Sequence, residues 1–396
     1  MITTWLKRNL FRSPADAVVT VLAGGLSIYV IYQALVFVFV TGRWEIIQVN
    51  LKLLLVGRFP EEQLWVVGGS IVAIAFWAGL VARSLRRQAP EKRNLASIIF
   101  GNLSRFGLLI LLVILLVLLS DASESWLLAG AVLAAVLVGR MVGALRDRVT
   151  FLARMPRIIW ILPWTLLPLG MIYYTLSISA LEEWGGFLIN FYIAVLAIAL
   201  CFPLGVLLAL GRRSSLPIVR LITTSYIELI RGAPLFVLLL LAGVALEFFV
   251  PPDLAPDQIF RAVTVFTLFT AAYLAEIVRG GLQSLPKGQT EAGKALGLST
   301  AKITFLITLP QALRNVIPAQ IGQFISLFKD TTLAGAALSV LEILNVGTAI
   351  TKQDDFLGQG LIYESLAFVG FLFWVGSFVM SRESQRLEKK LGVGLR

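Results

Sequence analysis

The sequence of 396 residues contains no histidine and a single cysteine, Cys201. The absence of histidine excludes metal sites built on imidazole and removes the commonest general base of enzymes. One cysteine cannot form a disulfide within the chain, and Cys201 lies in an apolar run, which is typical of a small buried residue. No segment reads G-x-x-x-x-G-K-[ST], the loop that cradles nucleotide phosphates. We therefore predict no catalytic residue, no metal site and no cofactor in this chain.

Charged residues are also scarce, at 14% of the chain against 58% hydrophobic residues. A soluble domain carries about 25% charged residues, so a chain of this composition must lie mostly in lipid. The formal net charge is +11, which in a soluble protein would suggest nucleic acid as a partner. Here the basic residues lie between apolar runs, where they orient membrane spans, so we expect no nucleic-acid partner.

The apolar runs are long enough for membrane helices, which need about 20 residues each. They predict an all-α, polytopic membrane protein with about ten transmembrane helices, near residues 15–40, 64–82, 104–120, 126–145, 158–179, 187–210, 220–248, 259–280, 312–332 and 361–381. Membrane lipid is therefore an expected partner.

Basic residues follow alternate spans, as the positive-inside rule requires of cytoplasmic connections. They come after the second, fourth, sixth and last spans, as Arg83, Arg86, Arg87, Lys92, Arg93, Arg146, Arg148, Arg154, Arg157, Arg212, Arg213, Arg220, Arg382, Arg386, Lys389, Lys390 and Arg396. The connections at 121–124, 181–184 and 251–257 are acidic or lack basic residues. The first outer loop is an exception, because it mixes Arg43, Lys52, Arg58, Glu45, Glu61 and Glu62. Both termini are predicted to be cytoplasmic, and the N-terminus reads as a membrane helix rather than a cleaved signal peptide.

Two connections are not simple turns. Residues 279–310 are too polar to span the membrane and too long for a hairpin turn. Residues 333–363 mix apolar and polar side chains, and we interpret them as an outer-face helix or a re-entrant piece broken at Gly347 and Gly358.

The most informative segment is the loop at residues 284–310, which the topology places in the cytoplasm. Its pattern predicts two short helices around a glycine. Ser284 is placed to cap the first helix, and Gly297 to end it in a left-handed conformation. Ser299 or Thr300 can then cap the second helix. A short amphipathic helix of this kind suits a groove in a soluble partner.

Seven positions of this loop resemble the EAA loop of permease subunits of ATP-binding-cassette (ABC) importers. They are Glu291, Ala292, Gly293, Gly297, Ile307, Leu309 and Pro310, at the spacing of that pattern. The third position departs from it, because Gly293 replaces an alanine, a change of one small residue for another. The resemblance implies that these seven residues couple the chain to a separate ATPase, which binds ATP and Mg²⁺.

The segments around the loop are similar to the polar-amino-acid branch of this family, at residues 226–235, 272–284, 311–318 and 328–333. The resemblance implies a five-helix, type I ABC-importer core at residues 185–396, preceded by an N-terminal extension of about five helices at residues 1–184. Permeases with such an extension resemble the general, or neutral and acidic, amino-acid importers of Gram-negative bacteria and cyanobacteria. The implied location is the bacterial inner membrane. The implied partners are ABC ATPase subunits, a second permease subunit (a homologue or another copy of this chain), a periplasmic amino-acid-binding protein and an amino-acid substrate.

Ionisable residues within the core spans are candidates for the translocation pathway, because such charges are costly in lipid. Glu228 and Arg231 are three residues apart on one helix, so they can pair with each other or serve in a gate. Glu276 and Arg279 have the same spacing, and we interpret them as a structural pair.

A second cluster lies at the end of the ninth predicted span, as Lys329, Asp330, Thr331 and Thr332. Lys329 could meet the carboxylate of a zwitterionic ligand and Asp330 its ammonium group. The same two residues could instead form an interfacial pair that braces the outer surface.

Three other classes of membrane protein are compatible with an apolar chain of this length. A secondary amino-acid transporter or channel would need coupling-ion carboxylates deep in the bundle, and the spans offer few. A membrane enzyme would need catalytic groups, and the chain has neither histidine nor a G-x-S-x-G segment. A structural scaffold would not require the fixed spacing of the loop. The sequence therefore favours a permease subunit.

Overall fold

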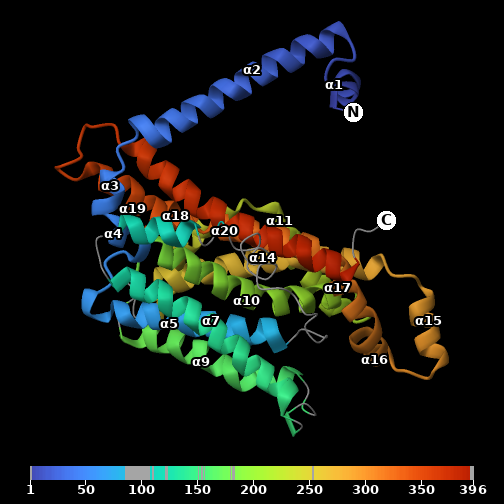
Figure 1. Cartoon of the computed structure of the whole chain (residues 1–396). Helices are drawn as coiled ribbons and strands as arrows, with labels where there is room; N and C mark the ends of the chain where they lie inside the picture. Colours follow the sequence, from blue (N-terminus) through green and yellow to red (C-terminus); the bar gives the residue numbers. More distant parts are fainter. Residues whose placement is uncertain are drawn as a thin grey trace. The chain divides into compact units, whose positions relative to one another are not determined.

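The structure is a computed structural model of the chain, and it describes residues 2–84, 108, 111–120, 124–149, 151–152, 155, 157–178, 180, 183–251 and 254–392 (Figure 1). The regular elements in these ranges are helices, and the β-type contacts there are two isolated bridges. The all-α class predicted from the apolar runs is thus confirmed. The chain divides into two compact units, Met1–Ile46 and Ile47–Arg396, which are described separately.

The first unit contains one helix of membrane-spanning length. α1 covers Ile2–Asn9, and α2 covers Pro14–Val36 and continues as the π-helical turn η1, Phe37–Thr41. Ser13 caps α2 by accepting a hydrogen bond from the Asp16 N–H at 3.1 Å. The combined helix is apolar enough to cross a membrane, and α2 has no buried residue. It corresponds to the first predicted span.

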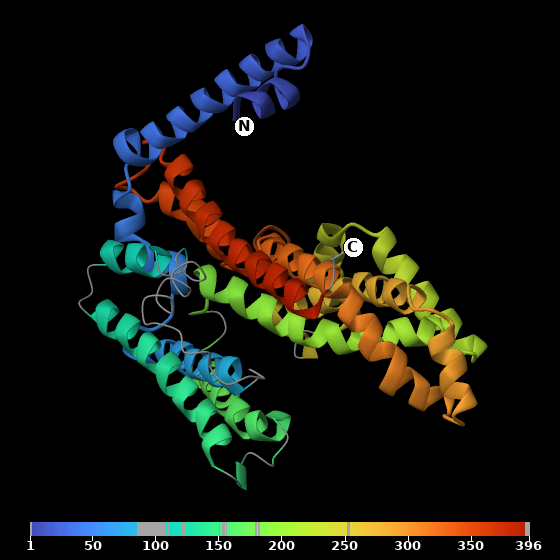
Figure 2. The same cartoon turned by 45° about the vertical axis from the view of Figure 1, so that its right-hand side comes forward.

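Three helices form a bundle early in the second unit, side by side in Figure 2: α5 (Leu64–Ser84), α7 (Glu124–Arg148) and α9 (Arg157–Ile178). α5 and α7 approach closely because a glycine on each faces the backbone of the other. A Cβ on Gly79 or on Gly139 would collide with a carbonyl of the partner helix. Small residues allow this packing between membrane helices. α9 joins through a buried hydrogen bond of 2.9 Å between the hydroxyls of Ser70 and Thr175.

The segment between α2 and α5 also contains helices, namely α3 (Glu45–Val49), α4 (Leu51–Val56) and the 3₁₀ turn η2 (Glu61–Gln63). α4 packs against two helices from the C-terminal half, α10 (Gly186–Arg212) and α19 (Ile343–Ala349). The Gln353 amide donates a hydrogen bond to Asn50 Oδ1 at 2.8 Å. The ring of Trp184 lies edge-on to Phe59 at 5.7 Å and to Tyr192 at 4.7 Å. The first loop of the chain is therefore part of the packed structure.

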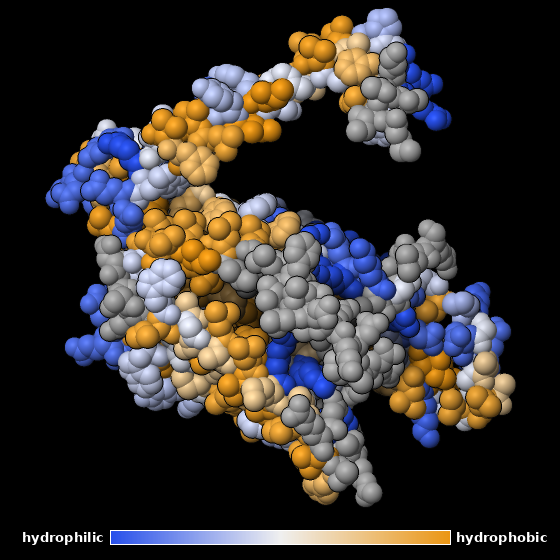
Figure 3. All heavy atoms as spheres, viewed as in Figure 1, coloured by the Kyte–Doolittle hydropathy of each residue, from blue (hydrophilic) through white to orange (hydrophobic). Residues whose placement is uncertain are grey.

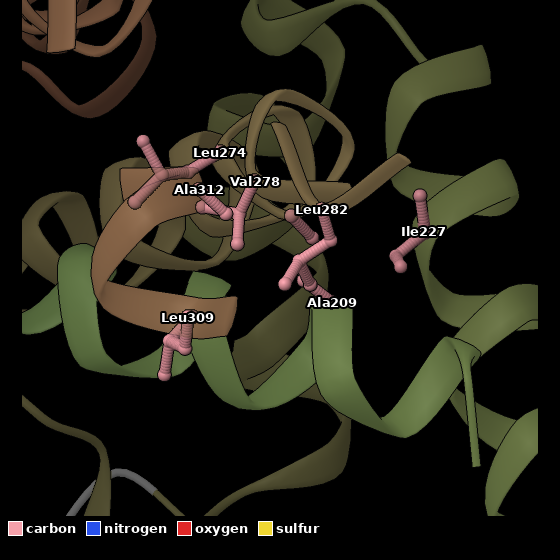
Figure 4. Packing of buried hydrophobic residues seen from close by; sticks show 8 residues of the cluster. Ala209, Ile227, Leu274, Val278, Leu282, Leu309 and Ala312 are labelled. Carbon is pink, nitrogen blue, oxygen red and sulfur yellow. The ribbon is translucent and has the colours of Figure 1, made fainter. Parts of the chain in front are cut away.

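The C-terminal half is built around α14. Its long helices are α10, α11 (Pro217–Gly232), α14 (Gln258–Gln283), α17 (Leu309–Asp330) and α20 (Ile362–Leu391), and the short elements α12 (Leu235–Leu240), η4 (Leu241–Ala245) and α13 (Leu246–Phe249) follow α11. α14 packs against α10, α11 and α17, and 61% of its apolar window is buried, the largest share among the candidate spans. Figure 4 shows Leu274 and Val278 of α14 beside Ala209, Ile227 and Ala312 of the three neighbours.

Seven helices in the described ranges are long and apolar enough to cross a membrane. They correspond to the first, second, fourth, fifth, sixth, eighth and tenth predicted spans. Of the third predicted span, residues 104–120, the structure describes residue 108 and residues 111–120, and residues 111–119 are helical. The ninth, residues 312–332, is matched by α17, a helix of 22 residues that is not apolar enough to join the seven.

The seventh predicted span, residues 220–248, is wrong as a single helix. α11 and the helix that follows it from Leu235 to Ala245 are bent by 104°. The break lies at Pro234, which has no N–H to donate and forces the preceding residue out of the helical conformation. Ala233 accordingly has φ −97° and ψ 140°.

Residues 333–363 contain the short helix α18 (Leu333–Leu338), α19 and the 3₁₀ turn η7 (Ile350–Lys352), so this segment is partly helical. The predicted break at Gly347 is wrong, because Gly347 lies within α19, where a Cβ would come within 2.8 Å of Ser365 Oγ on α20. The chain turns instead at Ser339, with φ 57°. The predicted break at Gly358 is confirmed by its φ of 75°.

Candidate functional site

The loop at residues 284–310 begins where α14 ends. Ser284 caps that end: its N–H bonds to the Gly280 carbonyl at 3.0 Å, and its hydroxyl donates to the Gly281 carbonyl at 2.9 Å. The prediction that Ser284 starts the first loop helix is therefore wrong. That helix, α15 (Gly288–Ala295), begins four residues later.

α15 ends at Ala295, and Gly297 terminates it in a left-handed conformation, as predicted. Gly297 has φ 72°, a left-handed conformation that favours glycine. Its N–H bonds to the Lys294 carbonyl at 2.9 Å, and the Leu298 N–H bonds to the Gly293 carbonyl at 3.1 Å. These two bonds define a Schellman cap. Ser299 then caps the next helix by accepting from the Lys302 N–H at 3.4 Å.

The second loop helix continues without interruption into α17. α16 (Thr300–Lys302) is followed by the π-helical segment η6 (Ile303–Thr308), and α17 begins at Leu309. Pro310 lies in the first turn of α17, next to the wider turns of η6, which accommodate a residue that cannot donate a helical hydrogen bond. The Gln311 side chain donates to the Ile307 carbonyl at 2.8 Å.

The loop presents an uncovered apolar surface. Gly293 is buried, and a Cβ there would lie 2.8 Å from Ile303 Cγ1, so α15 packs closely on η6. On the outside, Leu296, Phe305 and Leu306 are 78%, 57% and 70% exposed. Glu291 and Ala292 are exposed on α15 as well. Figure 3 shows apolar and polar patches side by side on the part of the surface that Figure 1 labels α15 and α16.

Five charged residues from three helices meet near the same end of α14, where the loop begins: Arg212 of α10, Glu228 and Arg231 of α11, and Glu276 and Arg279 of α14. Arg212 Nη1 lies 2.7 Å from Glu276 Oε1, and Arg212 Nη2 lies 2.6 Å from Glu228 Oε1. Arg279 Nη2 lies 2.7 Å from Glu276 Oε2, which confirms the predicted pair. Arg231 Nη1 is 3.8 Å from Glu276 Oε2, so the predicted pairing of Glu228 with Arg231 is wrong. The neighbouring helix supplies a better-placed cation for Glu228.

The cluster at residues 329–332 does not converge on one site. Lys329 is exposed and Asp330 is half-buried, whereas Thr331 is completely buried. The Thr331 hydroxyl donates to the Phe328 carbonyl at 2.8 Å, and the Thr332 hydroxyl donates to the Lys329 carbonyl at 3.0 Å. The Thr331 side chain is therefore part of the buried core and does not face a ligand site shared with Lys329 and Asp330.

Sequence reasoning missed a buried polar cluster around Thr331. The Asn190 amide of α10 donates to Thr331 Oγ1 at 3.0 Å and to Glu342 Oε2 at 3.2 Å, and it accepts from the Ile343 N–H at 3.1 Å. Asn190, Thr331 and Glu342 are each 0% exposed. A Cβ on Gly335 would meet Glu342 Oε1 at 2.5 Å, so only glycine leaves room for the carboxylate. The available signal was a lone polar residue in each of two apolar runs.

Glu342 also caps α19. Its carboxylate accepts from the Leu344 N–H at 2.9 Å and from the Asn345 N–H at 2.8 Å. Burial raises the pKa of Glu342, while these two N–H groups and the Asn190 amide act in the opposite direction. The cluster joins α10, the end of α17 and the start of α19, and its donors and acceptors are matched. This geometry is that of a structural brace.

Comparison with known proteins identifies the class. Residues 201–393 match the family described as binding-protein-dependent transport system inner membrane component. The glutamate/glutamine/aspartate/asparagine transport system permease protein BztC of Rhodobacter capsulatus is 45% identical over 53% of this chain and 48% of its own length. The inner membrane amino-acid ABC transporter permease protein YhdY of Escherichia coli is 40% identical over 56% of this chain and 60% of its own length. The matched region therefore spans about half of BztC and three fifths of YhdY.

A third relative is matched over most of its length. The probable glutamine ABC transporter permease protein GlnP of Bacillus subtilis is 31% identical over 52% of this chain and 91% of its own length. The chain belongs to the family of binding-protein-dependent transport system inner membrane components. This result confirms the permease family predicted from the loop at residues 284–310.

Proposed function

We propose that this chain is the membrane-spanning permease subunit of an ATP-driven importer and that it provides the passage for an amino acid. The observation that carries the proposal is the loop at residues 284–310. Its Schellman cap at Gly297 and its packed Gly293 give physical roles to two positions of the family pattern. The matched relatives are amino-acid permeases, which supports an amino-acid cargo, neutral, acidic or of broad range.

ATP binding belongs to a partner in this proposal. A soluble ATPase docks on the outside of α15, where Glu291, Ala292 and Leu296 are exposed. That partner holds ATP and Mg²⁺. A second permease subunit, either a homologue or another copy of this chain, completes the passage, and a periplasmic amino-acid-binding protein delivers the cargo. The chain is multi-pass in a bacterial inner membrane, with both termini and the loop in the cytoplasm.

The structure suggests how a movement of the loop reaches the membrane. The loop has no hinge on its C-terminal side, because α16, η6 and α17 form one continuous helical rod. On its N-terminal side it joins α14, the most buried span. α14 and α17 pack where a Cβ on Gly281 would lie 2.8 Å from the Ala312 carbonyl, so displacement of α17 must displace α14 as well.

The charged cluster then has a mechanical role at this end of the passage. Glu276 of α14 pairs with Arg279 of the same helix and with Arg212 of α10, and Arg231 of α11 approaches it. These contacts make α10 and α11 move together with α14. At the other end of α17, Lys329 and Asp330 stay candidates for the carboxylate and ammonium groups of the cargo. Thr331 and Thr332 stabilise the end of α17 through their hydrogen bonds to the carbonyls of Phe328 and Lys329.

The experiment compares Gly297→Asp with Gly358→Asp. Both glycines have a positive φ, 72° and 75°, with open space around them, so the backbone strain of about 1–2 kcal/mol is matched. Each variant is co-expressed with the partner chains whose genes neighbour its own. The complex is purified through a tag on this chain and reconstituted in vesicles. We expect Gly297→Asp to insert normally but to lose the ATPase subunit and ATP-driven amino-acid uptake, while Gly358→Asp keeps both. Wild-type uptake by Gly297→Asp would overturn the proposal.

A further inference from the structure

The last helix carries a polar pocket that transport does not explain. The pocket has a volume of about 150 Å³ and is lined by Arg382, Gln385, Arg386 and Lys389. These residues lie at positions i, i+3, i+4 and i+7 of α20, so they share one helix face. Three of the four side chains are cationic. Arg386 pairs with Glu383, and Arg382, Gln385 and Lys389 are exposed. The pocket offers hydrogen-bond donors and excess positive charge, which suit an anion.

The pocket lies where α20 leaves the hydrocarbon. α20 has 30 residues, which at about 1.5 Å per residue gives about 45 Å, against about 30 Å for the hydrocarbon core of a bilayer. Residues 365–381 carry no charge, and Arg382 is the first charged residue after them. About 20 residues from Ile362 cross the core, which brings the helix to Arg382. The pocket is therefore at the depth of the lipid headgroups.

An aromatic ladder leads from the apolar part of α20 to this pocket. The rings of Phe371 and Trp374 are 6.2 Å apart, and those of Trp374 and Phe378 are 5.5 Å apart. The guanidinium of Arg382 lies 5.6 Å from the centre of the Phe378 ring. Leu366, Trp374 and Phe378 are 41%, 53% and 38% exposed, so this stripe faces outward from the chain. One helix face thus presents apolar rings and then cations, in the order in which a phospholipid presents its acyl chain and its phosphate.

We propose that this face of α20 binds an anionic phospholipid, with the headgroup phosphate in the pocket and an acyl chain along the aromatic ladder. Arginine pairs with phosphate through two parallel hydrogen bonds, and clustered basic residues just outside a membrane helix recognise anionic headgroups. A free phosphate ion would use the same cations but would gain nothing from Trp374 and Phe378. The ladder is the reason to assign the pocket to a lipid.

The test uses the purified full chain in detergent, with phosphatidylglycerol, phosphatidylcholine or inorganic phosphate added, and counts bound molecules by native mass spectrometry. The variant Arg382→Gln/Lys389→Gln removes two charges from the pocket. Arg213→Gln/Arg220→Gln removes two exposed charges, one just after α10 and one in the first turn of α11, and is the matched control. We expect wild type and control to retain phosphatidylglycerol over phosphatidylcholine and the pocket variant to bind it about tenfold more weakly.

Four results would overturn the proposal. Equal losses in the two double variants would show that overall charge, not the pocket, attracts the lipid. Displacement of phosphatidylglycerol by inorganic phosphate at equal concentration would assign the pocket to a free ion. If the pocket variant does not fold, the wild-type protein is instead crosslinked to a photoactivatable phosphatidylglycerol. Crosslinks outside residues 366–389 of α20, or a second protein chain crosslinked through that segment in native membranes, would then refute the lipid site.

Discussion

Replacing Asn190 by alanine tests whether the buried polar cluster braces the protein. Asn190 is completely buried and makes three hydrogen bonds, to Thr331, to Glu342 and from the Ile343 N–H. Alanine removes all three and leaves a buried carboxylate short of one donor and a buried N–H without an acceptor. Both groups are then buried away from water without a full set of hydrogen-bond partners. Removing one partner of a buried hydrogen bond is costly for this reason.

The magnitude follows from the number and type of these bonds. A hydrogen bond to a charged group contributes about 1.5–3 kcal/mol, and a buried unsatisfied donor costs about 1–3 kcal/mol. Side-chain hydrogen bonds between membrane helices average nearer 0.6 kcal/mol, with a maximum of about 1.7. Three bonds, one of them to a carboxylate, therefore predict a loss of about 2–4 kcal/mol in the free energy of unfolding.

The measurement is unfolding of the purified chain in detergent, followed by the fluorescence of its nine tryptophans. Asn9→Ala is the matched control, since Asn9 is exposed on α1 and bonds only to the Trp5 carbonyl of its own helix turn. We expect that control to stay within about 0.5 kcal/mol of wild type. A double-mutant cycle with Thr331→Val should show a coupling of about 0.5–3 kcal/mol. Wild-type stability of Asn190→Ala, or strict additivity with Thr331→Val, would refute the brace.

Two further substitutions test other contacts by the same assay. Gly139→Leu inserts a side chain where even a Cβ meets the Phe76 carbonyl, and we expect it to lower the free energy of unfolding by at least about 2 kcal/mol. Gly130→Leu, on the same helix but with open space around it, should leave stability unchanged, and equal effects would contradict the close crossing of α5 and α7. Arg212→Gln removes the cation shared by Glu276 and Glu228 and should cost about 1–2 kcal/mol, whereas Arg213→Gln, on the exposed neighbour, should cost nothing measurable. Equal stability of these two variants would show that Arg212 does not hold the three helices together.

The features that the sequence predicted well are determined locally. A membrane helix is defined by its own apolar length, and most of the predicted spans are matched for that reason. The left-handed Gly297 and the capping Ser299 depend on neighbours within a few residues, so the loop pattern was sufficient to place them. Even the pair of Glu276 and Arg279 is separated by a single helical turn.

The features that it predicted badly depend on distant partners or on directions in space. Glu228 was expected to pair within its own helix, but Arg212 of α10 comes nearer to it once α10 and α11 are packed together. Asn190 and Glu342 are 152 residues apart, and no local pattern relates them. Residues 220–248 were predicted to be one span, yet the chain breaks at Pro234 and the two helices are bent by 104°.

The two glycines of the loop show how the same residue type meets different physical requirements. At Gly297 the requirement is a backbone conformation, because φ is 72° and a Cβ would have open space. At Gly293 φ is ordinary, and the requirement is space, because a Cβ would approach Ile303 Cγ1 at 2.8 Å. The nearest atom, Cγ1, is bonded to the branched Cβ of Ile303, so a methyl group at position 293 requires Ile303 or α15 to shift. The alanine of the family pattern would therefore need a local shift of the packing at Gly293, whereas at Gly297 it would carry backbone strain.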